Sequence, residues 1–135
     1  MDNLYAAGLE QASFHLAKRG TLYPFIVRIG LDGDISTAMI DQGPKGPTNG
    51  DEVAEAHWDL LRKTRDESRA VALVLDVYIR AVGSDAVSIL CEHRDGLALA
   101  LNTQYARKGF PKKLSMSETS VSAGIRTVWP ERATS

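Results

Sequence analysis

Residues 70–105 contain three runs of strand-forming residues separated by two short turns. The runs are 70–82, 86–94 and 97–105, and Val, Leu, Ile and Ala dominate them. The turns, at 83–85 and 94–96, contain Gly83 and Gly96, and glycine supplies the positive φ angles that tight turns need. Because turns this short can join only antiparallel neighbours, the segment predicts an antiparallel meander.

The register of this meander follows from the turn lengths. Turns of three residues would place Val82 opposite Ala86 and His93 opposite Leu97. Successive side chains on a strand point to opposite faces, so this register sorts them into an apolar and a polar set. The apolar face is expected to hold Leu73, Leu75, Val77, Ile79, Ala81, Val87, Ile89, Cys91, Leu97, Leu99 and Leu101. The opposite face provides a candidate interaction surface formed by Asp76, Tyr78, Arg80, Leu90, Glu92 and Asn102.

The stretch CEHRDG, residues 91–96, gathers the only cysteine of the chain with two acids, a histidine and an arginine. In the predicted register Cys91 points into the core and Glu92 points to the other face. His93 shares the side of Cys91 but lies about 7 Å along the strand. The stretch is therefore interpreted as the end of a strand followed by an Asp-Gly turn, and not as a reactive cluster.

The remaining chain predicts two helices and one hairpin. Helical spacing of apolar residues favours helices over 3–19 and 51–67, and LDGD joins strands at 23–30 and 35–41. The predicted architecture is a single α+β domain with a five-stranded, mainly antiparallel sheet. Its element order is α-β-β-α-β-β-β, and both helices are expected on one face of the sheet. Side-chain character alternates enough along residues 124–129, GIRTVW, to suggest a short edge strand.

Length and charge indicate how the chain is organised. At 135 residues it fits one domain, with a compact core at 1–105 and a basic, partly irregular segment at 106–135. The core has 10 Lys and Arg against 15 Asp and Glu, whereas the segment has 6 against 2. The overall net charge of −1 gives no strong field for nucleic acid. The basic residues near Phe110 in ARKGFPKK are better explained as part of a solvated loop than as a nucleic-acid site.

Targeting features are missing from the pattern. The first residues lack a basic region followed by an apolar one, and no run of about 18 apolar residues occurs. A cytoplasmic protein without membrane contact is therefore expected.

Several stretches of the sequence resemble a family of small uncharacterised bacterial proteins. The resemblance rests on Pro24-Phe25, Asp32-Gly33, Asp76-Val77, Arg80, Glu92-His93 and Gly96. It covers about residues 1–105 and implies a bacterial origin and a shared fold, but no activity. Tyr105-Ala106 departs from the family pattern, because the resemblance implies an aromatic residue next to a proline at this position. The order of elements also resembles that of roadblock and profilin-like domains.

Candidate chemistry centres on the polar face of the meander. The predicted register sets Asp76 opposite Glu92, and two adjacent carboxylates would raise one pKa, as acid–base catalysis requires. Arg80 or Arg94 could instead neutralise them as cross-strand ion pairs. A small hydrolase or isomerase using Asp76, Glu92 and His57, with Glu55 and Asp59 raising the pKa of that histidine, is thus one hypothesis.

Other chemistry has little support in the sequence. The three histidines do not have metal-binding spacing, and no nucleotide-binding or nucleophile-elbow motif occurs, so no metal and no cofactor are predicted. The glycines of GPKGPTNG, 43–50, alternate with prolines, which lack the N–H donors of a phosphate cradle.

The sequence most favours a non-catalytic protein-interaction module that forms a homodimer. Small residues around Tyr78 and Leu90, such as Ala98 and Ala100, would let a helix, a second subunit or a ligand approach that face. A dedicated partner of a toxin, such as an immunity protein, is the remaining alternative.

Overall fold

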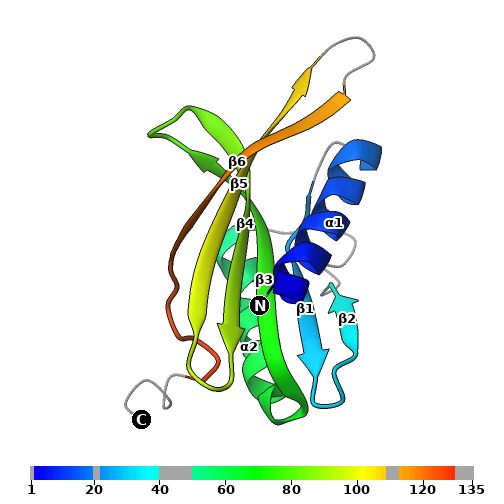
Figure 1. Cartoon of the computed structure of the whole chain (residues 1–135), viewed down its shortest axis with the longest axis vertical. Helices are drawn as coiled ribbons and strands as arrows, with labels where there is room; N and C mark the ends of the chain where they lie inside the picture. The colour runs from blue at the N-terminus through cyan, green and yellow to red at the C-terminus, as the bar shows by residue number, and fades with distance from the viewer. Residues whose placement is uncertain (1, 20–21, 40–49, 109–112, 130–135) are drawn as a thin grey trace.

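A computed structural model describes residues 2–19, 22–39, 50–108 and 113–129. The two helices and the first five strands occur in the predicted sequence order, but a 3₁₀ turn follows the second helix and a further strand follows the fifth (Figure 1). The loop predicted at 43–50 lies almost wholly outside the described residues, as do Phe110 and its neighbours. The elements are α1 (Asp2–Arg19), β1 (Phe25–Gly30), β2 (Ile35–Ala38), α2 (Gly50–Lys63), a 3₁₀ turn (Arg65–Glu67), β3 (Ser68–Ile79), β4 (Ser84–His93), β5 (Ala98–Lys108) and β6 (Lys113–Ala123).

Within the described residues, six strands form one antiparallel sheet in the order β2-β1-β3-β4-β5-β6. The α+β class is confirmed, but the expectation of five strands is wrong. The additional strand is β6, from the segment expected to be partly irregular, whereas residues 124–129 are not a strand. The predicted core boundary at residue 105 falls inside β5.

The second hairpin of the meander has the predicted register, and the first does not. Glu92 pairs with Ala98, as expected from the turn at 94–96. In the first hairpin Ala86 pairs with Val77 and not with Val82, because the turn comes earlier and Ile79 already pairs with Ser84. This shift of five positions is an odd number, so it moves every side chain of β3 to the other face of the sheet.

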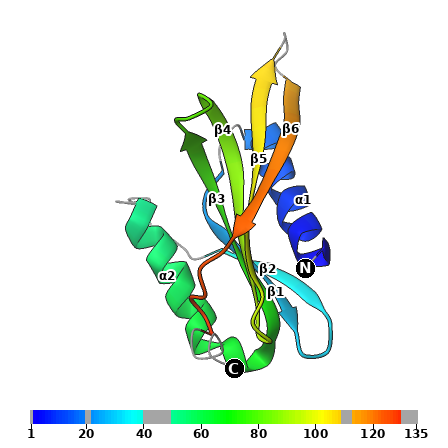
Figure 2. The ribbon, with the colours of Figure 1, turned by 60° about the vertical axis from the view of Figure 1, so that its left-hand side comes forward.

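The two helices cover opposite faces of the sheet, so the prediction of one shared face is wrong (Figure 2). On the α1 face, Gly8 lets the helix approach closely, because a Cβ there would lie 3.2 Å from Cγ2 of Val74. The core of that face comprises Leu4, Ala12, Leu16, Leu22, Phe25, Val27, Ala70, Ala72, Val74, Val87, Ile89, Cys91 and Tyr105. The α2 face has a smaller core of Ile26, Leu61, Val71, Leu73, Val128 and Trp129.

The turns predicted at LDGD and CEHRDG are confirmed, whereas the one predicted at 83–85 lies earlier, at 80–83. Val53, His57 and Leu61 are buried on α2, at spacings of four residues that place them along one side of the helix. In the LDGD turn Gly33 adopts a φ of 92°, and Oδ1 of Asp32 accepts a hydrogen bond from the amide of Asp34. The end of β4 runs into a turn in which Gly96 has a φ of 126°, so CEHRDG is a strand end and a turn.

None of the helices in the described ranges is both long enough and apolar enough to span a membrane.

Candidate functional site

The six residues of the predicted interaction face do not share one face. Asp76 pairs with Val87 on the α1 face, and Tyr78, which is 61% exposed, is two residues further along the same strand. Arg80 lies in the turn after β3. On the α2 face are Leu90, Glu92 and Asn102, because their register partners belong to that side.

The predicted pairing of Asp76 with Glu92 is wrong. Glu92 pairs with Val71, five residues before Asp76 on β3, which corresponds to about 16 Å along the strand. The two carboxylates also project from opposite faces of the sheet. They therefore cannot act on one substrate atom, and the hydrolase hypothesis loses the pair on which it was built.

Glu92 is instead the centre of a buried clasp on the α2 face. It is 1% exposed, and its carboxylate accepts hydrogen bonds from three successive backbone amides, those of Thr127, Val128 and Trp129, at 2.6–3.1 Å. Bonds to an ionised acceptor are about twice as strong as neutral ones. The clasp fixes residues 124–129, which we call the C-terminal strap.

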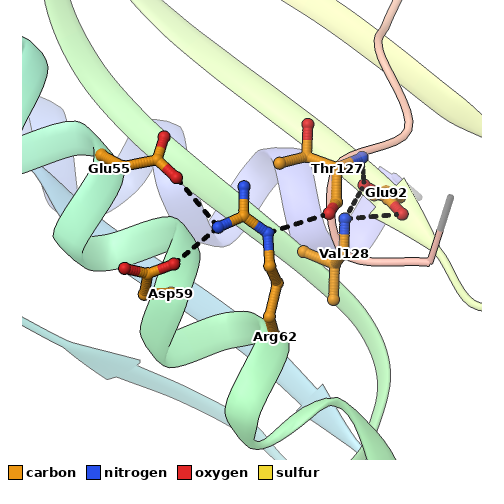
Figure 3. Close-up of polar contacts among 6 residues, drawn as sticks. All are labelled: Glu55, Asp59, Arg62, Glu92, Thr127 and Val128. Carbon is orange, nitrogen blue, oxygen red and sulfur yellow. Dashed lines mark hydrogen bonds and ion pairs between the residues drawn. The ribbon is translucent and has the colours of Figure 1, made fainter.

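Two arginines hold the other side of the strap backbone. Nε of Arg62 donates to the carbonyl of Thr127 at 3.2 Å, and Nη1 of Arg65 donates to the carbonyl of Val128 at 3.0 Å. Arg62 also forms ion pairs with Glu55 at 2.9 Å and Asp59 at 2.7 Å (Figure 3). The strap is thus held through its amides by an acid and through its carbonyls by bases, without being a strand of the sheet.

His57, His93 and Cys91 have environments that account for them as parts of the fold. Nδ1 of His57 donates to the carbonyl of Val53 at 2.7 Å, and Glu55 and Asp59, expected to act on His57, pair with Arg62. His93 lies in the turn, with Nδ1 2.7 Å from Oδ1 of Asp95. Burial raises the pKa of the Cys91 thiol to about 11, so little thiolate, the nucleophilic form, exists at neutral pH.

Asp76 retains a local hydrogen bond on the α1 face. Its Oδ1 accepts from the hydroxyl of Tyr105 at 2.7 Å. Loss of solvent around the carboxyl raises the pKa of Asp76, the bond from Tyr105 lowers that pKa, and the nearby Asp85 raises it again. No group of three or more His, Cys, Asp and Glu that could hold a metal occurs among the residues with described positions.

An apolar pocket of about 250 Å³ lies on the α2 face beside the strap. Trp58 of α2 forms one wall, and the strap residues Gly124, Ile125 and Thr127 contribute another. Leu90 of β4 and Ala100 of β5 also line it. Ile125 is 86% exposed although it belongs to an anchored segment. A second pocket, of about 310 Å³, lies on the α1 face between α1 and β2.

The outer edge of β6 is the other prominent feature. This strand has 11 residues, twice the usual length, and it ends the sheet within the described part of the chain. A register shift near Tyr105 and Met116 disturbs its first half. The second half, residues 119–123, pairs regularly with β5, and all five side chains are exposed and uncharged.

No known protein family, curated protein or solved structure matches the chain. The resemblance to small bacterial proteins therefore stays a prediction. Inference about function depends on the geometry of this chain, and three features distinguish it: the clasp, the pocket and the edge of β6.

Sequence reasoning missed the clasp and the strand β6 for identifiable reasons. The partners of Glu92 are backbone amides 35–37 residues away, and backbone groups leave no side-chain signature. The segment of β6, KLSMSETSVSA, lacks the apolar alternation of a half-buried strand because much of it is exposed on both faces. The strand-favouring residues Thr119 and Val121 were the available signal.

Proposed function

We propose that the protein is a non-catalytic interaction module that forms a homodimer through the outer edge of β6. The observation that carries this proposal is the segment 119–123, an exposed, regularly paired and uncharged edge. Edge strands of monomeric proteins are commonly protected by charged side chains, prolines or short length. The segment has none of these protections.

The sequence of this edge suits pairing with a second copy of itself. A twofold axis at Val121 would set Ser120 of one copy opposite Ser122 of the other, and Val121 opposite Val121. Val121 is 59% exposed on the α1 face, and a cross-strand pair of β-branched residues stabilises an antiparallel contact. Two six-stranded sheets would then form one continuous sheet.

The other edge of the sheet is a poorer candidate. Strand β2 has four residues, which offer fewer backbone hydrogen bonds than β6. It also begins immediately after the Asp32-Gly33 turn, whose two acids, Asp32 and Asp34, would face a second copy. Like charges brought together in this way oppose pairing.

The side chains that could have carried out catalysis are separated or already engaged in the fold. Asp76 and Glu92 lie on opposite faces, the carboxylate of Glu92 is occupied by three backbone amides, and Cys91 is a buried thiol with a high pKa. Each of these groups has a structural role that leaves it poorly placed for chemistry.

The test is the mass in solution and its response to Val121→Lys. Light scattering coupled to size exclusion is expected to give about twice the chain mass of 14.7 kDa at micromolar concentration. Val121→Lys would place two ammonium groups opposite each other at the axis and should give a monomer. The matched control is Ser36→Lys, on the exposed edge strand β2, which should stay dimeric.

A cross-linking experiment checks the register. In Val121→Cys the two introduced thiols lie at the axis, so mild oxidation should give a covalent dimer, whereas Ser36→Cys should not. A wild-type monomer at micromolar concentration ends the dimer proposal. A dimer that persists in Val121→Lys would move the interface away from β6.

A further inference from the structure

The pocket on the α2 face is kept open by the way in which the strap leaves the sheet. Gly124 lies directly against β5, since a Cβ there would lie 2.9 Å from the amide nitrogen of Leu99 and 3.0 Å from the carbonyl carbon of Ala98. Its amide donates to the carbonyl of Ala98 at 3.0 Å. Beyond this point the chain diverges toward α2 and is next fixed at Thr127 by Glu92.

Both ends of this divergent segment are therefore anchored, and the space beside it is walled by fixed elements. Val128 and Trp129 are buried in the core against Leu61 and Leu73, which prevents the strap from moving inward to fill the pocket. The opposite wall, Trp58, packs partly against the same core. The cavity of about 250 Å³ is thus a consequence of the clasp.

We propose that this pocket binds an uncharged two-ring aromatic compound that carries one hydrogen-bond donor. A dry cavity of about 150 Å³ accommodates benzene, so the observed volume suits a second fused ring. The lining contains no Asp, Glu, Lys, Arg or His among the described residues, which disfavours a charged ligand because its desolvation would not be compensated.

Two lining residues give the ligand its orientation. Trp58 offers an aromatic ring, and offset or edge-to-face ring pairs are favourable beyond the area that they bury. Thr127 supplies the polar group: its hydroxyl donates to the carbonyl of Ile125 at 3.3 Å and keeps lone pairs that can accept a bond. A phenolic O–H or an indole N–H would complete that site.

The pocket borders the proposed dimer edge, because Ala123, the last residue of β6, is one of its lining residues. The other lining residues lie outside segment 119–123, so ligand binding and self-association are measured separately. The rival occupant is an apolar side chain of a second copy, such as the exposed Ile125. That occupant would make ligand binding compete with self-association, and Ala100→Phe would then dissociate the dimer.

The experiment uses 2-naphthol as the probe and amide chemical shifts of the full chain as the readout. Naphthol is expected to bind with a Kd of about 10⁻⁵–10⁻⁴ M, as suits about ten non-hydrogen atoms, and to shift the amides of Gly124 and Ile125 and the indole N–H of Trp58. The carboxylate 2-naphthoate should bind at least about tenfold more weakly.

Variants locate the binding. Ala100→Phe fills the pocket and should abolish the shifts, whereas Ala38→Phe, the same change in the lining of the second pocket, should leave the Kd unchanged. Thr127→Val keeps the backbone amide that Glu92 binds and removes only the hydroxyl. It should weaken naphthol about five- to tenfold and leave naphthalene unaffected, so it decides the matter even if Ala100→Phe does not fold.

Three results would overturn the proposal. The first is no shift at millimolar naphthol. The second is naphthol binding that Ala100→Phe and Thr127→Val leave unaltered, which would place the ligand elsewhere. The third is a dimer that dissociates in Ala100→Phe while naphthol does not bind the wild-type chain, because the pocket would then belong to the dimer interface.

Discussion

The two faces of the sheet are covered by different physical means. On the α1 face a helix packs directly on apolar side chains, and Gly8 brings it close to Val74 and Ile89. On the α2 face the cover is shared between a helix and the irregular strap, which a buried carboxylate holds in place. Apolar packing has no preferred direction, whereas the clasp specifies which three amides must meet Glu92. An irregular segment therefore needs directional bonds where a helix needs only burial.

The largest expected effect is on the α2 face. Glu92→Ala would leave the buried amides of Thr127, Val128 and Trp129 without an acceptor, and each such group costs about 1–3 kcal/mol. We expect the free energy of unfolding to fall by about 3–5 kcal/mol, measured by urea denaturation. Hydrogen exchange of the three amides should accelerate before that of the β3–β4 ladder.

The control for this variant is Asp95→Ala, an exposed acid in the turn after β4, which should change stability by less than about 1 kcal/mol. If Glu92→Ala had an equally small effect, the strap would be held by apolar contacts alone, and the contrast between the two faces would disappear.

The next effect concerns the α1 face. Leu16 is completely buried, and Leu16→Ala should cost about 3 kcal/mol through lost burial and the cavity left behind. The matched control on the same helix is Phe14→Ala, because Phe14 is 55% exposed and its loss should cost less than about 1 kcal/mol. Urea unfolding measures both.

Variants on the two faces should also differ in how widely they reduce the protection of backbone amides from hydrogen exchange. Leu16→Ala is expected to speed hydrogen exchange across the whole sheet, since the buried residues of the α1 face come from four of its strands. Acceleration confined to α1 would instead indicate that this helix is as locally attached as the strap.

The sequence predicts the register of a strand when one face of that strand is buried, and it fails when both faces are buried. The second hairpin was predicted correctly, because its Asp-Gly turn fixes the pairing of His93 and its neighbours. The first hairpin was not, because β3 is buried on both faces around Val71–Val74. A strand that is apolar on both sides reads as a continuous run, so alternation cannot identify its register.

The same reasoning explains the candidate site. The sequence predicts that another surface could approach a face that includes Tyr78, Leu90 and Ala100. Leu90 and Ala100 line the pocket, whereas Tyr78 lies on the α1 face. The role of Glu92 was not recognised, because a lone acid on a strand is usually solvated. Its buried position depends on the strap, whose path is set by long-range contacts and not by local propensity.

A smaller effect is expected from the arginine side of the clasp. Arg62→Ala removes a bond to the carbonyl of Thr127 and the ion pairs with Glu55 and Asp59. The ion pairs are partly exposed and contribute about 0–1 kcal/mol, and the bond to the carbonyl about 1 kcal/mol. We expect a loss of about 1–2 kcal/mol in urea unfolding that shrinks as salt is added.

Arg69→Ala is the comparison for that variant. Arg69 also donates to a backbone carbonyl, that of Leu31, but at an exposed position. It should cost less than about 1 kcal/mol and respond less to salt. An equal effect of the two variants would mean that Arg62 contributes nothing particular to the strap.

The smallest expected change in stability concerns Asp76. This acid lies on the α1 face, whereas Glu92 lies on the α2 face. Loss of solvent raises the pKa of Asp76 in the folded protein, against the lowering effect of Tyr105. The folded protein therefore keeps a proton that the unfolded chain has lost, so ionisation of Asp76 favours unfolding. Its contribution to stability should decline as pH rises from near the ordinary value of 3.8 to just above the raised pKa.

Urea unfolding between about pH 4 and pH 7 tests this direction. Asp76→Asn cannot ionise and should lack that part of the decline, by less than about 1 kcal/mol because the partly exposed side chain is screened by solvent. Tyr105→Phe removes the bond that lowers the pKa and should make the decline steeper. If Asp76→Asn followed the wild-type profile, the carboxyl on the α1 face would be as fully solvated as an acid on the surface, and only the α2 face would have an acid that the fold constrains.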